Sequence, residues 1–132
     1  MKINYELIRN ILEVMEEYNM HEILGQELLK RLDIEEPKDD NSFIIYDNLI
    51  GHIKLLFDND CISTPSQNDK YGFINTAMYP MIYGPYRITA KGYDFLSGLR
   101  EDKVFSKIKD FSINVAIEAA KQLLVKLALG NL

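Results

Sequence analysis

The sequence has few of the residues that catalysis and covalent cross-linking most often use. It contains one cysteine, Cys61, and two histidines, His21 and His52. A single cysteine cannot form an internal disulfide, whereas small secreted domains are usually held together by several. We therefore expect the protein to lie in a reducing cytoplasm.

Long uninterrupted apolar runs are also missing. The first residues of the chain contain no apolar core of signal-peptide length. The most apolar stretch, residues 113–129, is interrupted by Glu118, Lys121 and Lys126. Such a stretch is too short and too charged to cross a bilayer. The sequence therefore predicts a protein without a membrane segment.

Positive charge is scarce as well, and it is unevenly distributed. The chain has 15 basic and 20 acidic residues, a net charge of −5. Residues 1–86 hold 7 basic and 15 acidic residues (−8), whereas residues 87–132 hold 8 and 5 (+3). Any attraction to phosphate is therefore expected to be local and to lie in the C-terminal third.

The motifs that would indicate an enzyme are incomplete. The segment from His21 begins like a zinc-protease helix, but Gly25 stands where the second histidine ligand is needed. Cys61 has no second cysteine and no histidine near it in sequence, and we interpret it as a small buried hydrophobic residue. No nucleophile, base and orienting group can be assembled from this pattern. We predict a protein that is not an enzyme and uses no cofactor or metal.

Hydrophobic periodicity predicts a mostly helical chain. Helices are expected over residues 4–18, 21–32 and 43–58, followed by short strands between 61 and 88 with a loop at 66–72. A further helix follows Thr89, its expected N-cap, and Gly92 is expected to permit close packing at its start. A last helical region covers 102–129, broken near 111–114. This order predicts an α+β, mostly α fold: a winged helix-turn-helix domain over residues 1–100 and a C-terminal helical arm over 101–132.

Four segments also resemble a known family. Residues 86–96, which include Thr89-Ala90-Lys91-Gly92-Tyr93-Asp94-Phe95-Leu96, are similar to a Leu-Thr-Trp-x-Gly-His-Asp-Phe-Leu signature, although Tyr93 replaces the usual histidine. Residues 2–12, 51–56 and 100–109 match other parts of the same pattern. These segments resemble domain-of-unknown-function family 2513, which is associated with phages and prophages. The resemblance implies a winged-helix-like fold and a phage-related setting, but no mechanism.

The helix at 43–58 would be the recognition helix of a helix-turn-helix protein, yet its predicted outer side is acidic. Its acidic residues would repel phosphates, and Lys54 alone supplies too few contacts, so this side suits a protein partner better than DNA. His52, on its flank, is either a hydrogen-bonded structural residue or a partner contact. Aromatic residues of the strand region either pack a small wing or anchor an interface. The candidate partner-binding residues are Asp47, Asn48, Gly51, His52, Leu55, Tyr79 and Tyr83.

Two function hypotheses follow from these observations. The first is a non-catalytic, phage- or prophage-encoded module that binds a protein partner as regulator or inhibitor of a host system. The alternative is a DNA-binding transcriptional regulator that contacts phosphates through Lys103, Lys107 and Lys109, which otherwise form a solvated basic helix face.

The last helix has an apolar arc wider than one contact face requires, so it either packs within its own domain or joins two copies. We expect a homodimer. The candidate dimerisation residues are Ala120, Leu123, Leu124 and Leu127.

Overall fold

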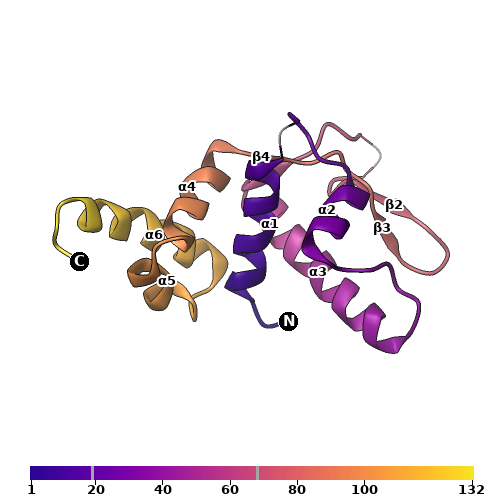
Figure 1. Cartoon of the computed structure of the whole chain (residues 1–132), viewed down its shortest axis with the longest axis horizontal. Helices are drawn as coiled ribbons and strands as arrows, with labels where there is room; N and C mark the ends of the chain where they lie inside the picture. The colour runs from indigo at the N-terminus through magenta and orange to yellow at the C-terminus, as the bar shows by residue number, and fades with distance from the viewer. Residues whose placement is uncertain (19, 68) are drawn as a thin grey trace.

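A computed structural model describes residues 1–18, 20–67 and 69–132 (Figure 1). Asn68, in the predicted loop, lies outside the described residues. The helices are α1 (Tyr5–Glu17), α2 (Gly25–Leu32), α3 (Asp40–Asp58), α4 (Ala90–Leu99), α5 (Asp102–Ile108) and α6 (Ile113–Ala128). The strands are β1 (Ile62–Ser63), β2 (Phe73–Asn75), β3 (Pro80–Ile82) and β4 (Arg87–Ile88). The fold is therefore α+β and mostly α, as predicted.

The strands form short antiparallel pairs that follow one another along a single hairpin. Strand β1 pairs with β4, with Ile62 opposite Ile88, and β2 pairs with β3, with Phe73 opposite Ile82. Ile23, between α1 and α2, joins the same hairpin through two backbone hydrogen bonds of 2.8 Å with Tyr86. The segment before α2 is thereby fixed against the chain that leads into β4.

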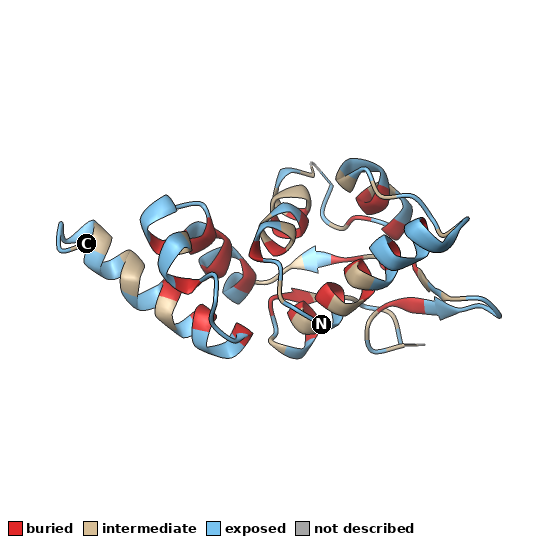
Figure 2. Ribbon diagram, turned by 90° about the horizontal axis from the view of Figure 1, so that it is seen from below, coloured by how far each residue is buried: buried red, intermediate tan, exposed pale blue. Residues whose placement is uncertain are grey.

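Helix α1 lies between two groups of elements (Figure 1). On one side are α4, α5 and α6, and on the other are α2, α3 and the hairpin. The side chains of Ile8, Ile11 and Leu12 in α1 are completely buried. The core continues through Val104 and Ile108, past residue 100 where we predicted the first domain to end. Figure 2 shows buried residues on both sides of α1, whereas the C-terminal half of α6 projects beyond the body of the molecule.

Two helix starts differ from the sequence prediction. Helix α2 begins at Gly25 and not at residue 21, because Ile23 is held in an extended bridge to Tyr86. Helix α3 begins at Asp40, three residues earlier than expected, because Asp39 is its N-cap. The Asp39 carboxylate accepts a hydrogen bond from the backbone N–H of Ser42 at 2.8 Å, and the Ser42 hydroxyl oxygen accepts one from the Asp39 N–H at 3.0 Å. These reciprocal bonds form a capping box.

The start of α4 confirms the predicted role of Gly92. The Thr89 hydroxyl caps the helix by accepting a hydrogen bond from the Gly92 N–H at 3.0 Å, and it donates one to the Asp60 carbonyl at 2.6 Å. A side chain at Gly92 would collide with the backbone carbonyl of Cys61. The absence of a side chain therefore lets α4 pack directly on the chain entering β1.

We predict that Gly92→Ala lowers the free energy of unfolding by about 1–3 kcal/mol, because the obstacle is backbone that cannot move aside cheaply. Chemical denaturation measures the change. Gly51→Ala is the matched control, since only the flexible Met1 side chain stands in its way. Equal stabilities for the two variants would contradict the assigned contact.

Candidate functional site

Helix α3 divides into one face that builds the core and another that faces solvent. The apolar positions that recur along α3 at helical spacing are all buried: Tyr46, Leu49, Ile50, Ile53, Leu56 and Phe57. Tyr46 also ties the helix to the hairpin, since its hydroxyl donates to the Pro80 carbonyl at 3.0 Å and accepts from the Ile82 N–H at 2.8 Å. The orientation of α3 is therefore fixed, and so is the face it presents outward.

The outward face carries exposed apolar side chains. Phe43 is 45% exposed and Ile44 65%. They line a shallow hollow of about 540 Å³. We call this face the α3 surface, and it comprises Met1, Phe43, Ile44, Asp47, Gly51 and Lys54. Burying an exposed side chain of the size of Phe or Ile contributes roughly 1.5–3 kcal/mol, so these positions could supply binding energy.

The approach to the α3 surface is strongly acidic. Between residues 33 and 47 the chain carries six carboxylates and one lysine, a local charge of −5 that equals the net charge of the whole chain. All seven charged side chains in this segment are exposed. A negative field over an apolar face disfavours nucleic acid and favours a positively charged partner.

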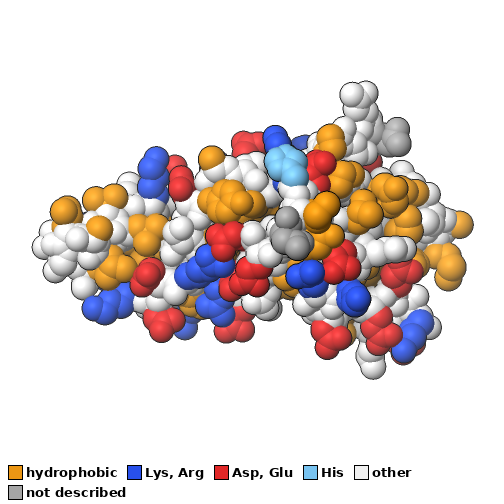
Figure 3. Space-filling model, turned by 45° about the horizontal axis from the view of Figure 1, so that its top comes forward, with side chains coloured by type: hydrophobic (Ala, Val, Ile, Leu, Met, Phe, Trp, Pro, Cys, Tyr) orange, Lys and Arg blue, Asp and Glu red, His pale blue; other side chains and the backbone are white. Residues whose placement is uncertain are grey.

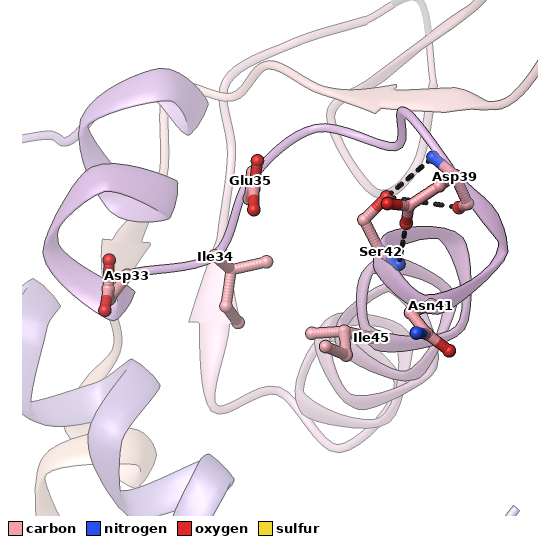
Figure 4. A pocket seen from close by; sticks show the side chains of 7 residues that line it. All are labelled: Asp33, Ile34, Glu35, Asp39, Asn41, Ser42 and Ile45. Atoms are coloured by element: carbon pink, nitrogen blue, oxygen red, sulfur yellow. Dashed lines mark hydrogen bonds between the residues drawn. The ribbon is translucent and has the colours of Figure 1, made fainter.

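A second hollow, of about 200 Å³, lies beside the start of α3 (Figure 4). Ile34, from the connection after α2, and Ile45, from α3, lie on opposite sides of it. Asp39 and Ser42 are bonded to each other in the capping box, and their hydrogen bonds lower the pKa of the Asp39 carboxyl. The polar groups of this hollow therefore stabilise the helix start.

The predicted partner residues of α3 differ in how far they are exposed. Asp47 is exposed, while Asn48 and Gly51 are half-buried at the hollow. Leu55, a predicted partner residue, is half-buried and packs against the core. His52 is completely buried, so we correct its assignment as a partner contact.

His52 instead fastens the N-terminal segment to α3. Its Nε2 accepts a hydrogen bond from the backbone N–H of Asn4 at 2.9 Å, and its Nδ1 lies 2.7 Å from the Asn48 carbonyl. The Asn4 N–H requires an unprotonated Nε2, so Nδ1 carries the hydrogen and donates to Asn48. Burial lowers the pKa of His52, against the opposing effect of the bond to Asn48.

We predict that His52 makes the protein less stable as the pH falls from 7.5 to 5.5. Because the folded pKa is lowered, the unfolded chain binds the proton more readily, and stability that is fully present above about pH 6.5 is lost below it. One proton limits the slope to about 1.4 kcal/mol per pH unit. Denaturant titrations across this range should show a slope that disappears in His52→Gln.

His21→Gln is the matched control, because His21 is exposed. It should keep the pH slope of the unaltered chain. A slope that survives in His52→Gln and vanishes in His21→Gln would contradict the assignment.

Tyr79 and Tyr83 do not belong to the α3 surface. The ring of Tyr79 packs edge-on against Tyr46, on the buried side of α3, with ring centroids 5.2 Å apart. Tyr83 is exposed near the hairpin, with Leu24, Ile74 and Met78 also exposed. Figure 3 shows hydrophobic side chains gathered over the end of the molecule that carries α2 and this hairpin. Residues 71–86 contain no charged residue, so this second apolar surface gives no charge signature of a partner.

Cys61 and His21 are the residues considered above as candidates for chemistry. Cys61 is completely buried, as predicted, and burial raises the pKa of its thiol to about 11. A thiol with so high a pKa is a poor nucleophile at neutral pH. The exposed His21 lies 3.5 Å from the Arg87 guanidinium. Within the described ranges, no group of three or more His, Cys, Asp or Glu side chains is arranged to hold a metal ion.

The predicted phosphate contacts are exposed on and just after α5. Lys103 and Lys107 are one helical turn apart. Lys109 lines a separate hollow of about 530 Å³ together with Lys2, but Glu6 and Asp110 line the same hollow. The carboxylates there balance the lysines, so the basic charge available to phosphate is modest.

The side chains of α6 become more exposed towards its C-terminal end. Ala120 is completely buried and lies close to Gly98 of α4, so we correct its assignment to a dimer interface. Leu123, Leu124 and Leu127 are half-buried. Farther out, Val125 is 57% and Leu129 69% exposed. The exposed apolar area of the arm therefore lies nearer its C-terminal end.

Sequence reasoning missed Met1, Phe43 and Ile44. A signal for two of them existed, because Phe43-Ile44-Ile45-Tyr46 is a run of four apolar residues within a helix. One helix face cannot hold four consecutive residues, so part of such a run must be exposed. Met1 gave no such signal, since its contact with α3 is set by the tertiary fold.

Fold and surface together define a small, mostly α domain with a buried thiol and an acidic, partly apolar helix face. Among the residues described, no helix is both long enough and apolar enough to span a membrane. A family model described as "Hypothetical protein (DUF2513)" matches residues 2–118. The chain belongs to this family, which confirms the resemblance. No curated protein and no solved structure matches the chain.

Proposed function

We propose that the chain is a non-catalytic winged-helix module that binds a protein partner through the α3 surface. In the phage or prophage setting that the family resemblance implies, such a module acts as a regulator or inhibitor of a host system. The observation that carries the proposal is the outward face of α3, where Phe43 and Ile44 are exposed beside Asp47.

The arrangement of elements supports the winged-helix part of the proposal. Helices α1, α2 and α3 precede a hairpin, and the extended segment at Ile23 pairs with Tyr86 next to the β1–β4 pair. A winged helix has this order: three helices, with a short strand between the first two that joins a terminal hairpin. The β2–β3 hairpin then corresponds to the wing, and α3 to the recognition helix.

The chemistry of α3 supports a protein partner. DNA affinity depends on several lysine or arginine contacts that release counterions from phosphates. The α3 surface offers Lys54 against Asp47, and the segment leading to it is acidic. Protein interfaces, by contrast, place aromatic and aliphatic side chains at their centre and charged groups at the rim.

We predict that the immobilised chain captures a partner from host lysate and that Ile44→Ser loses it. The substitution removes exposed apolar area without touching the core. Quantitative mass spectrometry of the eluates measures the loss. Val125→Ser, which removes comparable exposed area from α6, should retain the same partner; equal capture by both variants would refute the α3 surface as the binding site.

DNA binding is the second candidate, favoured by the exposed lysines near α5. If duplex DNA binds, we expect Lys103, Lys107 and Lys109 to carry the binding, and their joint replacement by Gln to flatten the salt dependence by up to about three phosphate contacts. Titration of random-sequence duplex at increasing salt measures the slope. An unchanged slope in the triple variant would contradict this assignment, and absence of binding at micromolar protein would leave the protein-partner proposal.

Self-association through α6 is a further part of the proposal. The half-buried Leu123, Leu124 and Leu127 share one side of α6, and a two-fold partner helix would cover that side. We predict a homodimer mass by light scattering at tens of micromolar, and a monomer mass for Leu127→Glu. A monomer mass for the unaltered chain would exclude this interface.

A further inference from the structure

The α3 surface contains a notch that is filled by an apolar side chain from elsewhere in the chain. Gly51 has no side chain, and the space that one would occupy is taken by the thioether of Met1. Met1 is itself 69% exposed, so its side chain covers the notch without being enclosed by it. The notch therefore accepts a long, unbranched apolar side chain, and its present occupant is held by few contacts.

The positions around the notch have the spacing of a helix-packing seam. Asp40, Ile44, Asp47, Gly51 and Lys54 follow one another at alternating intervals of four and three residues. This spacing places them along one line of α3, the geometry by which a second helix packs lengthwise against a first. A glycine in such a line allows the two backbones to come close.

Two of the three charged residues along this seam are acidic, and these two flank Ile44. Asp40 and Asp47 are exposed on either side of Ile44. The hydrogen bonds of the nearby Asp39 are directed to Ser42, whereas Asp40 and Asp47 face solvent. A partner helix that covers Ile44 must place its own side chains beside these two carboxylates, and cationic side chains do so most favourably.

We infer that the α3 surface binds an amphipathic helix in which one Leu or Met enters the Gly51 notch, displacing Met1, and flanking Lys or Arg residues pair with Asp40 and Asp47. This inference rests on the proposed function and specifies the chemistry of the partner. The second apolar surface, near the hairpin, does not indicate the charge of a partner, because residues 71–86 contain no charged residue.

A selection experiment separates this inference from the proposed function. The intact chain is immobilised and screened against a display library of 20-residue helical peptides, in parallel with Gly51→Leu and with Val125→Ser as the matched control. Gly51→Leu places a side chain in the notch, where a Cβ would meet the flexible Met1 side chain and no backbone. Its melting curve, recorded by circular dichroism, checks that it is folded.

Three outcomes are distinguishable. Enriched peptides that place a Leu or Met between basic residues at helical spacing, and that bind Val125→Ser but not Gly51→Leu, support the inference. Enriched peptides with the same dependence on Gly51 but neutral or acidic flanks overturn the inference and leave the proposed function standing. Peptides that bind Gly51→Leu as well as the unaltered chain overturn both.

Charge reversal provides a test that loss of folding cannot imitate. For a labelled Leu/Lys amphipathic peptide, fluorescence anisotropy should show at least about tenfold weaker binding to Asp47→Lys than to the unaltered chain. The matching Leu/Glu peptide should bind Asp47→Lys more tightly than it binds the unaltered chain. If Asp47→Lys leaves both affinities unchanged, the assigned charge pairing is wrong. Glu118→Lys, the same reversal on α6, is the control and should change neither affinity.

Discussion

Helix α1 is buried on two sides, and the elements on either side are packed against it. Its inner side chains contact α2 and α3 in one direction and α4 in the other, so the two groups of elements share one core. The Tyr5 ring packs edge-on against Phe95 of α4, and its hydroxyl donates to the Phe111 carbonyl at 2.6 Å, just before α6. Arg100, at the end of α4, pairs with Glu16 at 2.7 Å. A change within α1 would therefore affect both groups together.

Because α1 fixes α3 from behind, the outward face of α3 can serve recognition without maintaining the fold. Tyr46 and Leu49 are buried, whereas Ile44 and Asp47 contribute nothing to the core. His52 is also buried, although Gly51 before it lies on the α3 surface. Its bond to the Asn4 N–H fixes the backbone after Met1 beside α3, which brings the Met1 side chain within reach of Gly51.

The distribution of charge favours a protein partner over DNA. The acidic residues are concentrated before and within the first turns of α3, where a DNA-binding protein of this type would present cations. The basic residues of α5 are distant in sequence, and Lys109 shares its hollow with two carboxylates. Apolar area and negative charge at the same face are the properties of a surface that recognises a cationic, amphipathic partner.

Local patterns in the sequence were enough to identify the six buried apolar residues of α3, the start of α4 and the close packing at Gly92. These features follow from periodicity and from capping chemistry, which act between residues close in the chain. Local patterns did not determine that α2 starts at Gly25, because the extended backbone at Ile23 depends on Tyr86, 63 positions later. The burial of His52 and Ala120 was likewise decided by tertiary contacts, with Asn4 and with Gly98. Only the folded chain brings Met1 to Gly51, since no local pattern encodes a contact between residues so far apart in sequence.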